Sequence, residues 1–146
     1  MPLLKSWVSS ANDPANPFPL NNLPYGVFAT QGTAPRCGVA IGDMILDMQS
    51  AEENRLIDLT DAALFELPFW NDLMEEGPAV WAALRKRLTA LLAEGAPERD
   101  KVAPLLVPMD RAEMHMPLMV SEYTDFYAGR HHATNVGTMF RGAENA

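Results

Sequence analysis

The residues that are scarce in this sequence already narrow what the chain can be. Cys37 is the single cysteine, so no disulfide can form within the chain, which fits a reducing compartment. No apolar run approaches the ~20 residues that a membrane-spanning helix needs. The first residues lack the basic flank and apolar segment of a secretory signal peptide. We therefore expect a cytoplasmic protein that has no membrane partner.

Basic side chains are scarce as well. The 11 Lys and Arg residues stand against 19 Asp and Glu residues, which gives a formal net charge of -8. A surface of this charge repels nucleic acid, so we expect neither DNA nor RNA as a partner. The one basic cluster, at residues 85–87, is interpreted as the solvated face of a helix.

The first third of the sequence combines a proline-rich arm with strand signals. The chain has 146 residues, of which 48% are hydrophobic, so it is long enough to bury one core. Repeated prolines in residues 1–24 exclude a helix or a continuous strand, so we expect an irregular arm anchored by Trp7, Phe18 and Leu20. Strands are predicted at residues 25–30, 36–41 and 44–47, the last two paired across a turn at Gly42 and Asp43.

The remaining sequence mixes helical and strand signals. Residues 78–94 give the clearest helix, because Pro78 suits the first helical position and Gly95 lies just past the end. An apolar stripe runs along this helix from Val80 through Trp81 to Leu92. The other predicted elements are a helix at residues 59–67 and short strands at residues 105–107 and 114–120. Together these elements predict a mainly β fold with α insertions (α+β), built on a small barrel, with a domain boundary near Pro117.

Residues 123–141 carry the side chains from which a catalytic site could be built. Adjacent helix positions point in different directions, so His131 and His132 cannot both bind one metal ion. Asp125 lies seven residues before His132, which corresponds to a rise of ~10 Å along a helix. At that separation the two side chains cannot form a direct hydrogen bond, but they could contact the two ends of a substrate. The candidates are Asp125, Tyr127, His131, His132 and Arg141.

These side chains also have structural interpretations. Asp125 can be an aspartate that the helix dipole favours at a helix start. Tyr127 can pack beneath the helix; because it lies two residues from Asp125, we expect the helix to begin late, around Tyr127 or Ala128. Arg141 can follow the end of that helix, which we expect near Gly137, a residue able to adopt the left-handed cap.

Three separated stretches of the sequence resemble the fumarylacetoacetase family. They are Asn-Asn-Leu-Pro-Tyr-Gly-Val-Phe at residues 21–28, the hairpin residues 38–47, and residues 123–141. The resemblance implies an SH3-like small barrel as the N-terminal domain at residues 1–117. It also implies that residues 118–146 are the first helical segment of a larger β-rich catalytic domain, incomplete in this fragment.

The resemblance further implies a reaction and residue roles. Family members are hydrolases that cleave the carbon–carbon bond of fumarylacetoacetate, a diketo acid, to fumarate and acetoacetate in the last step of tyrosine and phenylalanine catabolism. Asp125 matches a ligand of Ca²⁺ and/or Mg²⁺, and His132 matches the general base that activates water. Tyr127 and Arg141 match substrate-binding positions, whereas His131 falls at a variable position and is expected on the surface. The family also implies a homodimer.

Two alternatives from other classes stay open at this point. One is a standalone SH3-like interaction or dimerisation module without catalysis, for which the prolines of residues 14–24 could be a ligand. The other is a small metalloprotein that uses Asp125 with His131 and His132, which the adjacency of the two histidines disfavours. His115 is interpreted as a packed strand histidine rather than a ligand.

Residues 1–146 alone are expected to bind no divalent cation tightly and to hydrolyse no substrate. The single carboxylate of Asp125 cannot supply the roughly 6–8 oxygen ligands of Ca²⁺ or the octahedron of Mg²⁺. Calorimetric titration of the chain with Ca²⁺ should therefore detect no sub-micromolar site. A sub-micromolar affinity would contradict this expectation.

Overall fold

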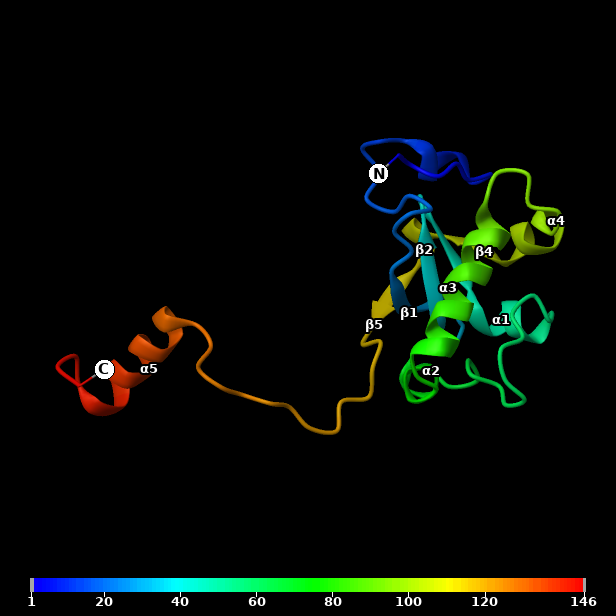
Figure 1. The fold of residues 1–146 in the computed structure, drawn as a ribbon. Helices are drawn as coiled ribbons and strands as arrows, with labels where there is room; N and C mark the ends of the chain where they lie inside the picture. The colour runs from blue at the N-terminus through cyan, green and yellow to red at the C-terminus, as the bar shows by residue number, and fades with distance from the viewer. Residues whose placement is uncertain (1, 146) are drawn as a thin grey trace.

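The centre of the structure is a five-stranded antiparallel sheet in the order β4-β3-β2-β1-β5. The structure is a computed structural model that describes residues 2–145. The sheet curls into a half-barrel, and helices accompany it (Figure 1). This architecture is consistent with the predicted SH3-like α+β domain, although the fold is mixed α and β rather than mainly β and the sheet forms a half-barrel. The strands are β1 (Tyr25–Ala29), β2 (Arg36–Ile41), β3 (Met44–Asp47), β4 (Leu106–Pro108) and β5 (Glu113–His115).

The longest helix, α3 (Pro78–Leu92), lies across one face of this sheet (Figure 1). Pro78 takes the first helical position as predicted, and Leu84, Leu88 and Leu91 are fully buried. Trp81, predicted to lie in the buried stripe, is instead 43% exposed. No helix within residues 2–145 is both long and apolar enough to cross a bilayer. The other helices are η1 (Ser9–Asn12), α1 (Met48–Glu53), α2 (Asn71–Glu75), α4 (Arg99–Val102), η2 (Ala103–Leu105), η3 (Met109–Arg111) and α5 (Arg130–Arg141).

The turn between β2 and β3 shows why glycine stands there. Ile41 pairs with Met44 across the turn, as predicted, and Gly42 has a φ of 58°, a region that favours glycine. A side chain at position 42 would also place its Cβ 2.7 Å from the backbone nitrogen of Ala11 in the N-terminal arm. Phe18 in the same arm accepts a hydrogen bond from the Gly42 N–H through its carbonyl oxygen at 2.7 Å. The hairpin and the arm are therefore packed against each other.

The helix predicted at residues 59–67 is wrong. The two carboxylate oxygens of Glu52, on α1, accept hydrogen bonds from the backbone N–H groups of Leu64 and Phe65 at 2.8 and 3.1 Å. Leu64 and Phe65 are also buried in the core. Tertiary contacts have thus taken over the backbone donors that a helix would need, which overrides the local helix propensity.

The basic cluster on α3 is less solvated than predicted. Arg85 donates to the carbonyl oxygen of Asn21 at 2.6 Å, and Arg87 donates to the carbonyl oxygen of Leu56 at 2.7 Å. Lys86, between them, is exposed. Because a guanidinium can reach several carbonyl groups at once, the two arginines tie the arm and the loop after α1 to the same helix.

The sheet face opposite α3 carries an ion pair. Arg36 Nε lies 2.6 Å from Asp47 Oδ2, and the Asp47 side chain is 7% exposed. Its second oxygen, Oδ1, accepts a hydrogen bond from the backbone N–H of Ser50 at 3.1 Å and so caps α1. One carboxylate therefore connects β2, β3 and the first turn of α1.

Replacing Asp47 with alanine is expected to lower the free energy of unfolding by about 2–3 kcal/mol. The helix cap is lost and the half-buried Arg36 loses its partner. Asp47→Asn should cost less, because asparagine also caps helices well. Urea denaturation measures both effects, with Asp58→Ala at an exposed carboxylate as the matched control. Wild-type stability in Asp47→Ala would show that this carboxylate does not hold the elements together.

Candidate functional site

The predicted site residues lie on a segment that leaves the sheet after β5. The strand predicted to run to residue 120 ends at His115, and residues 116–129 extend as an irregular chain to α5 (Figure 1). We call residues 2–119 the body and residues 120–145 the tail. Asp125 and Tyr127 lie on the irregular part of the tail, His132 lies in the first turn of α5, and Arg141 is its last residue.

The limits predicted for the terminal helix are wrong at both ends. The helix begins at Arg130, not near Tyr127, and it continues through Gly137 to Arg141. An interior glycine weakens a helix by only about 1 kcal/mol and does not by itself end it. The end falls at Gly142, which has a φ of 83° and whose N–H donates to the Thr138 carbonyl oxygen at 3.0 Å. The glycine that ends the helix is therefore Gly142 and not Gly137.

Tyr127 lies near two of the other predicted site residues, one at each end of α5. The Tyr127 and His132 rings lie 5.5 Å apart between their centroids and are tilted by 31°. Tyr127 and Arg141 line the same open hollow along α5, where Gly137 contributes no side chain. His132 does not line that hollow, so Tyr127 is the residue that the two pairs share.

Asp125 is not part of this group. Its carboxylate is exposed on the irregular chain and does not line the hollow. Within residues 2–145, no three His, Cys, Asp or Glu side chains lie close enough together to hold a metal ion. Asp125 therefore offers one oxygen ligand of the kind that hard divalent cations take, without further ligands beside it.

The tail also exposes large apolar side chains. Phe140 is 81% exposed and Tyr127 is 62% exposed, and Tyr123, Phe126 and Met139 are similarly open. These side chains do not belong to the core cluster of the body. Apolar side chains gathered in this way on one segment are typical of a surface that another part of a protein covers.

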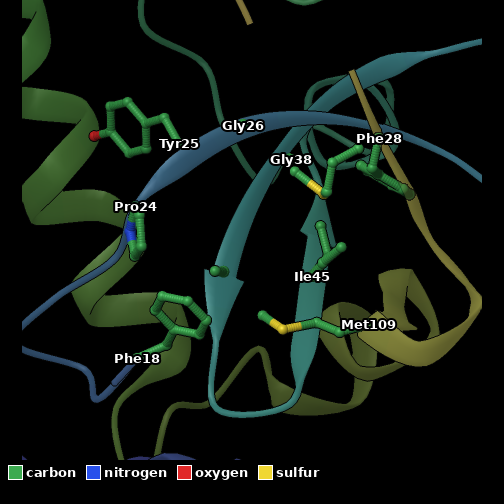
Figure 2. Close-up of a pocket in the computed structure, with 10 residues that line it drawn as sticks. Phe18, Pro24, Tyr25, Gly26, Phe28, Gly38, Ile45 and Met109 are labelled. Atoms are coloured by element: carbon green, nitrogen blue, oxygen red, sulfur yellow. The ribbon is translucent and has the colours of Figure 1, made fainter. Parts of the chain in front are cut away.

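A second, largely apolar hollow lies elsewhere, on the sheet face opposite α3. Figure 2 shows Phe18, Ile45 and Met109 around it, over the strands β1 to β3. Its volume is about 280 Å³, and Gly26 and Gly38 are among its lining residues. None of its lining side chains is a carboxylate, an imidazole, a thiol or an amine. The one ionisable side chain among its lining residues is the phenol of Tyr25, whose pKa is raised by burial.

Sequence reasoning missed the contacts that hold the last residues of the body, just before the tail begins. Trp70 and Asn71 bind residues 117–119 through hydrogen bonds. No local pattern points to Asn71, because its partner Met119 lies 48 residues further along the chain. The nearest signal in the sequence was Pro117, where a domain boundary was expected.

The chain is similar in sequence to proteins named fumarylacetoacetase over almost its whole length. The family model described as "Fumarylacetoacetase N-terminal" matches residues 21–117. The fumarylacetoacetase of Bos taurus is 44% identical over 148 residues, which cover 97% of this chain and 35% of that protein. The fumarylacetoacetase of Arabidopsis thaliana is 40% identical over 154 residues, covering 100% and 36%. The human fumarylacetoacetase is 40% identical over 148 residues, covering 97% and 35%. The chain thus spans about a third of the length of these relatives.

Cys37 is expected to be unreactive in the folded protein. Burial, with a smaller contribution from the negative charge of Asp72, raises the pKa of its thiol to about 12. At pH 8 such a thiol is about one part in ten thousand thiolate, whereas an unfolded cysteine has an ordinary pKa near ~8.5. Labelling with a chromogenic disulfide reagent at pH 8 should be slow in buffer and fast in guanidinium chloride. Rapid labelling in buffer would mean that the thiol is accessible and ionised.

Proposed function

The chain belongs to the fumarylacetoacetase family, and on that premise we propose that it is the N-terminal part of a hydrolase acting on fumarylacetoacetate. The reaction adds water across the carbon–carbon bond between two carbonyl groups and yields fumarate and acetoacetate. The observation that carries the proposal is the identity of about 40% to proteins named fumarylacetoacetase over 97–100% of the chain. We place the N-terminal domain at residues 1–117 and the start of the catalytic domain at residues 118–146.

His132 is the proposed general base. An imidazole has an unperturbed pKa near neutrality, so it can accept a proton from water at physiological pH. The resulting oxygen nucleophile adds to a carbonyl carbon, the carbon–carbon bond breaks, and the carbon that leaves takes up a proton. The Tyr127 ring 5.5 Å from the His132 ring supports a shared substrate position for the two side chains.

Tyr127 and Arg141 are the proposed substrate-binding residues. Fumarylacetoacetate carries carboxylates, and a guanidinium can pair with a carboxylate through two parallel hydrogen bonds. The hollow that Tyr127 and Arg141 both line supports their acting on one ligand. The phenol would donate one further hydrogen bond to an oxygen of the substrate.

Asp125 is the proposed ligand of a divalent cation, Ca²⁺ and/or Mg²⁺. A carboxylate oxygen suits either ion, but each needs several more ligands than residues 2–145 bring together. When bound, such an ion supplies a positive charge that polarises a carbonyl oxygen. The missing ligands would come from polypeptide outside this chain, since the relatives are about three times as long.

The assembly and location of the whole protein belong to the same proposal. We propose a cytoplasmic homodimer that takes part in tyrosine and phenylalanine catabolism, and the exposed apolar side chains of the tail support burial against further protein. The alternative of a standalone SH3-like module is not favoured. The similarity to the relatives covers the tail as well as the sheet, whereas a module would need only the sheet.

The proposal is tested with a chimera that joins this chain to the part of the bovine relative outside the matched stretch. The chimera should hydrolyse fumarylacetoacetate, with fumarate and acetoacetate appearing in equal amounts. His132→Ala should lower kcat by about 10²–10⁴-fold, as loss of a general base does. His131→Ala is the matched control, since it removes the neighbouring imidazole, and it should leave kcat near the wild-type value. Equal losses in the two variants would contradict the role of His132.

A further inference from the structure

Three hydrogen bonds fasten residues 117–119 to the rest of the body. The backbone N–H of Trp70 donates to the Pro117 carbonyl oxygen at 3.0 Å. The Asn71 side chain donates through Nδ2 to the Met119 carbonyl oxygen at 3.0 Å, and its Oδ1 accepts from the Met119 N–H at 2.9 Å. Within the described residues, the hydrogen bonds of the tail beyond Met119 join it only to itself. Met119 is therefore the last described residue that hydrogen bonds tie to the rest of the body.

The side-chain amide of Asn71 makes both of its hydrogen bonds to Met119 possible. It carries one acceptor and a donor group side by side, as a peptide group does, so it can pair with both backbone groups of a single residue. Aspartate at this position would keep the acceptor and lose the donor. Leucine has nearly the same shape and would lose both. Asn71 thus completes for Met119 the pairing that a neighbouring strand would give.

Asn71 stands on a rigid support. Trp70, the residue before it, is 3% exposed, and its indole N–H donates to the Gly26 carbonyl oxygen on β1 at 2.8 Å. The Trp70 ring stacks on Tyr25 with a centroid separation of 4.4 Å and meets the edge of Phe65 at 5.4 Å. Because both strand and core hold Trp70, the position of Asn71 is set by the sheet itself.

We propose that Asn71 is a positioning residue, which fixes the place and direction in which the chain leaves the N-terminal domain toward its catalytic residues. This inference rests on the proposed function. Asp125 follows Met119 by six residues, a reach of at most ~20 Å along an extended chain. If residues 117–119 come free, the segment that carries Asp125, Tyr127 and His132 starts from a wider range of positions. Such misplacement slows a reaction although no catalytic group is removed.

Amide hydrogen exchange on this chain tests the junction without any enzyme assay. In the wild-type chain, the Met119 N–H should exchange at least ~10-fold more slowly than the N–H of Val120, which has no such partner. Asn71→Leu should remove this difference and leave the sheet amide of Ile45 protected. Asn54→Ala is the matched control, because the Asn54 side chain donates only to the carbonyl oxygen of Ser50 within the same turn. Equal exchange of Met119 and Val120 in the wild-type chain would overturn the inference.

The chimera tests whether the junction matters for catalysis. Asn71→Leu removes one partner of the junction and Met119→Pro removes the other, the Met119 N–H. Each should lower kcat by about 3–10-fold, and the double variant should lose no more than either single one, because both break the same contact. If the two substitutions acted independently on the structure, their fold-losses in kcat would multiply in the double variant. That result, or an unchanged kcat in the single variants, would overturn the positioning role. Wild-type chimera that fails to hydrolyse fumarylacetoacetate would count against the proposed function, while the exchange of Met119 decides the junction separately.

Discussion

The burial of one sheet face beneath α3 is the contact on which the rest of the structure depends. Leu84, Leu88 and Leu91 of the helix join Val27 and Val39 of the sheet in a core from which water is excluded. Successive side chains of a strand point to opposite faces of the sheet, so the residues between the core positions lie on the face away from α3. There they form the Arg36–Asp47 pair and the apolar hollow of Figure 2. The body thus holds together through contacts within residues 2–119.

The tail stands in contrast to this body. Its side chains include the proposed catalytic and substrate-binding residues, yet they lie on a segment that the core does not hold. Tyr127 lies beside His132 and shares a hollow with Arg141, whereas Asp125 stands apart as a lone carboxylate. A base and an anion-binding group can be arranged by one helix, but a cation needs ligands from several directions. This difference explains why the proposed catalytic unit requires more protein than the described residues supply.

What could be predicted from the sequence followed from local rules. Gly42 and Pro78 mark their turn and their helix start because each residue favours one backbone conformation. The errors arose where distant contacts decide the outcome. Glu52 captures the N–H groups of Leu64 and Phe65 and so prevents a helix there. The identities of the candidate site residues could be predicted from the sequence and its family resemblance. The distances between their side chains could not.

We propose that the tail supplies one part of a metal and substrate site whose other part lies in further polypeptide. A crystal structure of the chimera grown with Ca²⁺ tests this proposal most directly. A carboxylate oxygen of Asp125 is expected within ~2.3–2.6 Å of the ion, with the remaining ligands drawn from the added polypeptide. Tyr127, His132 and Arg141 are expected to face the same cavity. An ion bound with Asp125 left in solvent would contradict the proposal.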